Sequence, residues 1–360
     1  GYEQGKQEGW NRGYAEIMEA FNKYYRKILV VTPSIDLPSL EIIIVQPLFH
    51  LQQQGHCHYD IAGETELSLE LIEAYELIIF LRCVEPEALE YLRAANRLGK
   101  KTVYAIDDNF IELPKSTSVS AYYMDSNRID TFSHFLREAQ LVKTGAPYFA
   151  DYIRTNYNAQ VVDIPDSFDT HWVEIGGKPP SDPEQITIGY EGTVKDTDFT
   201  PVIPALTRLL NEYGNRIKLQ FHGFAPEALL QYPQVTHEPV HLRYRDYIRR
   251  LYAANWDIGL APLADTTFNI CKTNNKYREY SSCGIAAICS RSPVYEPWIE
   301  HGQTGYLVDH TIEGWYAGLK HLIEDRPLRE HIKEESRLQA KQKFAIEVCA
   351  ERWRVQILMK

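Results

Sequence analysis

The sequence predicts an α/β protein made of two Rossmann-like domains that face each other across a cleft. Short runs of β-branched residues alternate with helical segments along most of the chain, which predicts parallel sheets covered by helices on both faces. The alternation stops at residues 175–183, where glycines and prolines favour a linker, and then starts again. A chain of 360 residues has room for two or three domains, at roughly 100–200 residues per domain.

In the first half of the chain, strands are expected at 28–31, 59–62, 77–81, 102–106, 141–142 and 161–162, where aliphatic and β-branched residues gather. Helices are expected at about 40–54, 86–98 and 147–154. The second of these has Pro86 in its first turn and Gly99 after its end, which are the usual signals for where a helix begins and ends.

In the second half, strands are expected at 186–190, 217–221, 258–261 and 286–288, with helices at about 201–213, 247–254 and 275–283. The chain is expected to be helical from Ile312 onward. Before both halves, aromatic residues at helical spacing predict an amphipathic helix from about Trp10. We therefore expect five segments: an N-terminal helical extension (1–26), an N-terminal domain (27–166), a linker (167–184), a C-terminal domain (185–342) and a C-terminal helix (343–360).

The composition excludes several classes of protein. The chain has 38 basic and 49 acidic residues, a net charge of −11, which disfavours general binding to nucleic acid or anionic membranes. No apolar run approaches the roughly 18 residues that a membrane-spanning helix needs. The start of the chain lacks the apolar stretch of a signal peptide, and the six cysteines show no CxxC spacing. We expect a cytoplasmic protein with reduced thiols, with attachment to a membrane surface left open.

The segment 268–290, which reads FNICKTNNKYREYSSCGIAAICS, has the richest set of polar side chains. It follows the expected strand 258–261 and opens a helix, where free N–H groups can bind phosphate. Lys272 and Lys276 are four residues apart, so they are expected to face one side and to suit a diphosphate. Glu279, on the same stripe, suits a ribose diol. Spacing alone leaves open an ordinary surface pair between Lys276 and Glu279.

Several motifs, in one order along the chain, resemble those of a known family. They are IGYEGT at 188–193 with Lys195-Asp196, DIGLAPL at 257–263, the set Phe268, Asn269, Lys272, Asn275, Lys276, Glu279 and Tyr280, and EHGQTGYLV at 300–308. Over about 185–310 the chain resembles the GT-B glycosyltransferases, in the large family-four group that uses nucleotide-activated sugars. Residues 27–165 are similar more weakly, through the strand VYAIDD at 103–108.

The resemblance implies a GT-B fold with the acceptor in the N-terminal domain and the nucleotide sugar in the C-terminal domain. It implies that the last helix crosses back to the first domain. The implied reaction transfers a hexosyl unit from a nucleotide diphosphate sugar to a hydroxyl, with retention and without an active-site metal. Glu279 matches the second glutamate of the family's E-x7-E motif, the usual ribose ligand. Cys271 stands where the first glutamate, near the transferred sugar, would be, and Lys272 is a candidate to replace it.

Glycosyl transfer breaks the anomeric C–O bond, and the departing diphosphate gains negative charge that must be stabilised. The candidate groups are three lysines and the backbone N–H groups near Gly192. The full set of expected donor-binding residues is Gly192, Thr193, Lys195, Asn269, Lys272, Asn275, Lys276 and Glu279. Spacing alone also allows a merely solvated Lys195, and a Gly192 that only makes a turn.

Asp107 and Asp108 end the expected strand 102–106 and should face the cleft. A carboxylate there could orient the acceptor hydroxyl or assist its loss of a proton, which makes both residues catalytic candidates. The alternative is a helix cap or turn pair.

We expect no metal site and no cofactor other than the nucleotide sugar as co-substrate. His56 and His58 alternate with Cys57 along a strand, so the thiol lies on the opposite face from the two imidazoles. The expected partners are the nucleotide sugar and a glycan, lipid-linked or protein acceptor, with no nucleic acid. Residues 1–26 are a candidate surface for a protein partner or for self-association. Two other functions stay open: a GT-B nucleotide-sugar epimerase or hydrolase, and a non-catalytic nucleotide-sugar-binding module.

Overall fold

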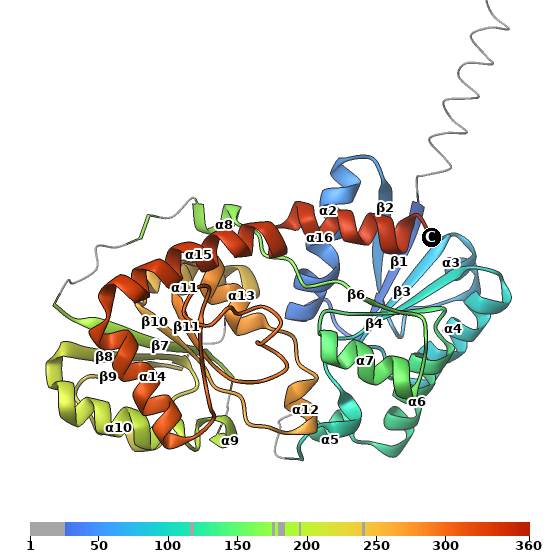
Figure 1. Ribbon diagram of the computed structural model, residues 1–360. Helices are drawn as coiled ribbons and strands as arrows, with labels where there is room; N and C mark the ends of the chain where they lie inside the picture. The colour runs from blue at the N-terminus through green and yellow to red at the C-terminus, as the bar shows by residue number, and fades with distance from the viewer. Residues whose placement is uncertain (1–25, 116–118, 175–176, 179–183, 194–195, 240–241) are drawn as a thin grey trace, which may run out of the picture.

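The computed structural model describes residues 26–115, 119–174, 177–178, 184–193, 196–239 and 242–360. Within this part of the chain, two six-stranded sheets, each with parallel pairing throughout, form two domains that lie next to each other (Figure 1). The predicted fold class, two Rossmann-like α/β domains, is confirmed. The helix expected near the N-terminus falls outside the described residues, and Arg26 already belongs to the first strand.

The N-terminal sheet has the strand order β2-β1-β3-β4-β5-β6. Its strands are β1 (Arg26–Thr32), β2 (Cys57–Gly63), β3 (Leu77–Leu81), β4 (Lys101–Ala105), β5 (Leu141–Thr144) and β6 (Val161–Asp163). The helices around it are η1 (Leu40–Val45), α2 (Gln46–Gln53), α3 (Leu69–Glu73), α4 (Pro86–Arg97), η2 (Phe110–Glu112), α5 (Ser120–Tyr123), α6 (Ser126–Glu138) and α7 (Pro147–Asn156). The short helix α8 (His171–Glu174), in the segment between the two sheets, packs against the helix α11 (Tyr244–Ala254) of the C-terminal domain.

The C-terminal sheet has the order β12-β11-β10-β7-β8-β9, which places the reversal of strand order between β7 and β10. Its strands are β7 (Ile186–Gly192), β8 (Ile217–Gly223), β9 (Val235–Glu238), β10 (Ile258–Ala261), β11 (Ala286–Ser290) and β12 (Tyr306–Val308). Its helices are α9 (Asp196–Phe199), α10 (Val202–Tyr213), η3 (Gly214–Arg216), η4 (Glu227–Leu229), α11 (Tyr244–Ala254), α12 (Thr267–Ile270), α13 (Asn275–Ser282), α14 (Ile312–Glu324) and α15 (Arg326–Phe344).

The strands form because their side chains are buried on both faces. All five residues of β3, with the sequence LIIFL, are buried, and a continuous apolar run of this kind is typical of a parallel strand between two helical layers. The same holds for β11, with the sequence AAICS. Among the described residues, no helix combines the length and the apolar character that crossing a bilayer would require.

The last helices return to the N-terminal domain. After α15, the helix α16 (Ile346–Trp353) and the final turns η5 (Arg354–Leu358) lie beside α2 and the N-terminal sheet (Figure 1). Ala350, Trp353 and Ile357 are buried in the same apolar cluster as the strands β1 and β3. The chain thus crosses between the two domains twice.

Three buried charged side chains join the domains near the first crossing. The Lys143 Nζ, at the end of β5, lies 2.8 Å from one oxygen of Asp166, and the Arg278 Nη1, on α13, lies 3.6 Å from the other. Their side chains are at most 2% exposed. A carboxylate held between two cations in a buried interface links α13 to the N-terminal domain.

Close packing beneath the C-terminal sheet gives a first prediction. A Cβ atom added at Gly189, in β7, would lie 1.9 Å from the ring of the fully buried Trp256. Gly189→Ala should therefore lower the free energy of unfolding by about 1–3 kcal/mol, the usual effect of overpacking a core. Urea unfolding measures the change. Gly177→Ala is the control, because nothing lies within 4 Å of that position, and it should change stability by less than about 0.5 kcal/mol. Equal stability of the two variants would contradict the packing.

Candidate functional site

A cavity of about 510 Å³ lies between the two domains, at the carboxyl ends of their strands. We call it the interdomain cavity. The N-terminal domain contributes Pro38, Ile42, Asp107 and Asp108 to its lining, and the C-terminal domain contributes the rest. Open α/β sheets bind ligands at this edge, where the strand order reverses, and here the reversal lies between β7 and β10.

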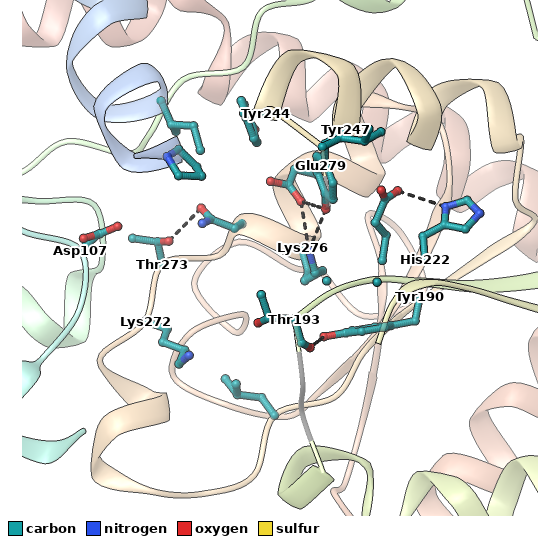
Figure 2. A pocket seen from close by; sticks show the side chains of 18 of the residues that line it. Asp107, Tyr190, Thr193, His222, Tyr244, Tyr247, Lys272, Thr273, Lys276 and Glu279 are labelled. Atoms are coloured by element: carbon teal, nitrogen blue, oxygen red, sulfur yellow. Dashed lines mark hydrogen bonds and ion pairs between the residues drawn. The ribbon is translucent and has the colours of Figure 1, made fainter. Parts of the chain in front are cut away.

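Three side chains form a hydrogen-bonded cluster at the start of α13 (Figure 2). The Lys276 Nζ donates to the Tyr247 hydroxyl at 2.8 Å and lies 3.3 Å from the Glu279 Oε2. The Tyr247 hydroxyl donates to the same carboxylate oxygen at 2.7 Å. The Glu279 side chain is 4% exposed and that of Lys276 is 23% exposed. The pair is therefore not a solvated surface pair, because the carboxylate is held inside the cavity wall and the ammonium is the more accessible partner.

Tyr244, from the same helix as Tyr247, packs against this cluster. Their rings stack with centroids 5.8 Å apart and planes inclined by 19°. Burial raises the pKa of the Tyr247 hydroxyl well above its usual value, and the carboxylates of Glu279 and Glu191 raise it further. The phenol therefore stays protonated at neutral pH and remains a donor to Glu279.

Lys272, Thr273 and Asn275 line the same cavity. Lys272 lies between α12 and α13, outside both helices, so it reaches the same cavity as Lys276 from a loop and not from a shared helical stripe. Its ammonium lies 4.4 Å from the centre of the Phe268 ring. The helix predicted at 275–283 is observed as α13, and it begins three residues after Lys272.

Asn269, predicted to bind the donor, does not line the cavity. Its Nδ2 donates to the Asp198 carboxylate at 2.8 Å and to the Ala264 carbonyl at 3.0 Å, and 7% of the residue is exposed. The Thr266 side chain caps α12 by accepting from the Asn269 N–H. Asn269 thus holds the loop that precedes the cavity. Lys195, another predicted donor residue, lies outside the described residues.

Gly192 and Thr193 bring main chain to the cavity at the end of β7. A Cβ atom at Gly192 would lie 2.8 Å from the Tyr190 hydroxyl, which itself donates to the Thr193 carbonyl at 3.2 Å. Next to it, Gly223 ends β8 with a φ of +84°, and a Cβ there would lie 2.4 Å from the Gly192 carbonyl oxygen. A glycine at 223 is therefore needed for the ends of β7 and β8 to approach so closely, and a glycine at 192 leaves room for the Tyr190 hydroxyl.

A buried ionic group at the back of the cavity was not predicted. Glu191 is 1% exposed, and it accepts from the Arg250 Nε at 3.0 Å and lies 3.4 Å from the His222 Nδ1. All three residues line the cavity. Glu191 belongs to the IGYEGT motif, and this motif was the feature of the sequence that could have identified it as a site residue. Its partners come from other elements, and their spacing along the chain gave no indication of this contact.

Asp107 and Asp108 reach the cavity from the N-terminal side, and both are engaged by Arg82. The Arg82 Nε lies 3.0 Å from Asp107, and its Nη2 donates to Asp108 at 2.5 Å. Ser39 donates to the other oxygen of Asp107 at 2.6 Å. Arg82 has a φ of +55°, a conformation that non-glycine residues adopt only where the surroundings hold them in it. Burial raises the pKa of Asp107, although Arg82 opposes that shift.

Cys271 is buried against the N-terminal domain and does not line the interdomain cavity. It belongs, with Phe268, to the apolar cluster of the first domain, and the Asn109 Nδ2 lies 3.6 Å from its sulfur. Burial raises the pKa of its thiol to about 11. This position, where the resembled family has a glutamate, is therefore a domain contact in this chain.

Metal-ligating side chains are scattered. In the described parts of the chain, no three His, Cys, Asp or Glu side chains come together as a metal-ion site would require. His58 pairs with Asp60 at 3.1 Å on the surface of β2, while Cys57 is buried on the other face.

Comparison with solved structures finds the same fold in several proteins. Anabaena HepE, in complex with UDP and glucose, superposes with a TM-score of 0.63 at 15% identity, over 91% of this chain and 98% of that one. A glycosyltransferase from Rickettsia africae gives 0.68 at 13% identity, over 93% and 98%. A Listeria monocytogenes protein proposed to be a UDP-N-acetylglucosamine 2-epimerase gives 0.56 at 11% identity, over 91% and 94%.

No protein-family model and no curated protein sequence matches the chain. At 11–15% identity the structural similarity establishes the architecture, which agrees with the two parallel sheets and the cavity between them. The chain therefore has the GT-B fold.

Proposed function

We propose that the protein is a glycosyltransferase, which moves a hexosyl unit from a nucleotide diphosphate sugar to an acceptor hydroxyl. The observation that carries the proposal is the cluster of Lys276, Glu279 and Tyr247 in the interdomain cavity of a GT-B fold. A buried carboxylate next to an accessible ammonium offers one group for a ribose diol and one for a phosphate within a single helical turn.

On the donor side, Glu279 accepts hydrogen bonds from the ribose hydroxyls and Lys276 meets the diphosphate. The first N–H groups of α13, from Asn275 onward, have no partner within the helix and add positive potential toward the cavity. Lys272 lies on the same cavity wall. Lys195 is proposed as a further cation near the end of β7.

The reaction needs stabilisation of the charge that develops on the departing diphosphate as the anomeric C–O bond breaks. In this proposal the lysines of the donor side supply it, so that transfer needs no active-site metal. Retention is proposed separately, from the resemblance to the family-four group. Asp107 or Asp108 orients the acceptor hydroxyl from the N-terminal side. Arg82 engages one oxygen of each carboxylate, and Ser39 donates to the second oxygen of Asp107.

The test is incubation of the full chain with labelled UDP-, GDP- and dTDP-sugars, with and without a panel of glycan, lipid-linked and protein acceptors. UDP-glucose heads the panel because HepE was solved with UDP and glucose. Label transfer that requires an acceptor supports the proposal. Donor conversion without acceptor would identify an epimerase or hydrolase, a function that the Listeria neighbour makes the second candidate. Nucleotide binding without any turnover would identify a binding module.

The ribose role of Glu279 can be measured separately. Glu279→Ala should weaken binding of the nucleoside diphosphate by about 1–3 kcal/mol, because a charged hydrogen-bond acceptor is removed. Isothermal titration of UDP measures the dissociation constant. Glu313→Ala, at an exposed position on α14, is the control and should bind as the parent does. Unchanged affinity in a folded Glu279→Ala variant would remove the role assigned to this residue.

A further inference from the structure

A second cavity, of about 650 Å³, lies in the C-terminal domain at the opposite end of the strands from the interdomain cavity. Its lining includes Ile186, the first residue of β7, together with Asp257 and Gly284, which come shortly before β10 and β11. Helix α15 forms its other side. We call it the amino-end cavity, and it shares no lining residue with the interdomain cavity.

The charged side chains around the amino-end cavity are mostly cationic. Six cations face three carboxylates, namely Lys178, Arg326, Arg329, Lys333, Arg337 and Lys341 against Asp257, Glu330 and Glu334. Five of these cations come from α15 at successive spacings of three or four residues, which puts them on one side of the helix. The local charge is thus opposite in sign to the net charge of −11 on the whole chain.

The carboxylates neutralise only part of this charge. The Lys333 Nζ lies 3.1 Å from Asp257 and 2.9 Å from Glu330. The Arg329 Nε lies 3.8 Å from the same Asp257 oxygen. Within the part of the chain that the structure describes, no carboxylate oxygen comes within 4.0 Å of the remaining four cations, Lys178, Arg326, Arg337 and Lys341. Of the three lining carboxylates, Glu334 is left to balance them.

Lys178 is the cation of the amino-end cavity that comes from outside α15. Its Nζ donates to the Gly284 carbonyl at 3.3 Å and lies 5.1 Å from the centre of the Tyr252 ring. Burial lowers the pKa of Lys178 to about 8, and Lys333 and Arg337 also lower it. An anion bound between these cations would reduce the electrostatic repulsion among them.

We propose that the amino-end cavity binds a small soluble ligand that carries two or more phosphate groups. The volume lies in the range of small-molecule sites, roughly 300–1,000 Å³. Several phosphate oxygens are needed to meet four cations, and the Arg326 and Arg337 guanidiniums can each bind a phosphate through two parallel hydrogen bonds. A long polyanion such as nucleic acid is disfavoured, because the remaining surface is acidic and would repel it.

The experiment is isothermal titration of inorganic pyrophosphate into the full chain and three variants. Arg337→Glu/Lys341→Glu disables the amino-end cavity at two exposed positions, and Lys276→Met disables the interdomain cavity. Arg97→Glu/Arg216→Glu, at two exposed positions elsewhere, makes the same change in net charge. The proposal expects binding to survive in the Lys276→Met variant and to weaken by about tenfold or more in Arg337→Glu/Lys341→Glu. The Arg97→Glu/Arg216→Glu control should bind as the parent does.

Two results of the pyrophosphate titrations would overturn the proposal. One is pyrophosphate binding that is lost with Lys276→Met and kept with Arg337→Glu/Lys341→Glu, which would place all of it in the interdomain cavity. The other is equal weakening in the Arg97→Glu/Arg216→Glu control, which would make it an effect of overall charge. A parallel flotation assay with phosphatidylglycerol vesicles separates a lipid headgroup from a soluble ligand. Vesicle binding that depends on Arg337 and Lys341, without binding of free pyrophosphate, would also contradict a soluble ligand.

Discussion

The Lys276→Met variant is expected to lose about 100- to 1,000-fold in turnover, the effect of removing one group that stabilises charge in a transition state. Methionine keeps the apolar stem of the side chain and removes the ammonium that faces the interdomain cavity. Because the charge on the diphosphate grows as the sugar bond breaks, kcat should fall more than nucleotide affinity does. Steady-state kinetics with the active donor, together with titration of the nucleotide, separates the two quantities.

Lys276→Arg and Lys320→Met serve as matched variants for this measurement. Arginine restores the positive charge and should recover part of the turnover, whereas loss of Lys320, on α14 far along the chain from the site, should leave it unchanged. A higher KM with an unchanged kcat would show that Lys276 binds the substrate and the transition state equally. Loss of turnover with no rescue by arginine and with altered unfolding would point to a structural fault.

The second large effect concerns the charged group between the domains. Asp166→Asn should lower the free energy of unfolding by about 3–5 kcal/mol, because Lys143 and Arg278 would keep their buried charges without the carboxylate between them. Urea unfolding followed by fluorescence measures the change. Asp151→Asn is the control, since that residue pairs with Arg154 at the surface with 77% of its side chain exposed. This control should change stability by about 0–1 kcal/mol.

Asp166→Asn also affects the site, because Arg278 precedes Glu279 on α13. The Arg278 Nη2 donates to the Tyr244 hydroxyl at 3.4 Å and lies 3.9 Å from Glu279. When Arg278 loses its carboxylate on the other domain, we expect weaker nucleotide binding along with the lower stability. A variant of unchanged stability would show that the Lys143–Asp166 contact is solvated in solution.

The architecture was predictable because its signals are local. A strand such as β3 is read from five consecutive apolar residues, and the helix α4 from Pro86 and Gly99 at its two ends. The strands β9 and β12 were not predicted: the sequence of β9, VTHE, has no apolar run, and that of β12, YLV, lies in the motif EHGQTGYLV, where no strand was assigned. The helix predicted at 275–283 is observed as α13, whereas the one-turn helix α12, which Thr266 caps, was not predicted.

The site was predictable only where one segment carries several of its groups. Lys272, Asn275, Lys276 and Glu279 lie within eight consecutive residues and line one cavity, as their sequence pattern suggested. The ionic groups around Arg82, Glu191 and Asp166 bring together residues that are distant in sequence, so spacing could not reveal them. These charged groups interact strongly because they are buried, and the burial of a side chain cannot be read directly from a single sequence.

The return of the C-terminal helix has a consequence for biosynthesis. Trp353 and Ile357 fill the layer that covers β1 and β3, yet the ribosome adds them after the whole second domain. The first domain therefore leaves the ribosome with that layer uncovered. It cannot complete its fold before the second domain is made, so the two domains do not fold strictly one after the other. A nascent chain arrested before Ile346 should therefore expose apolar surface to chaperones until the final helical turns arrive.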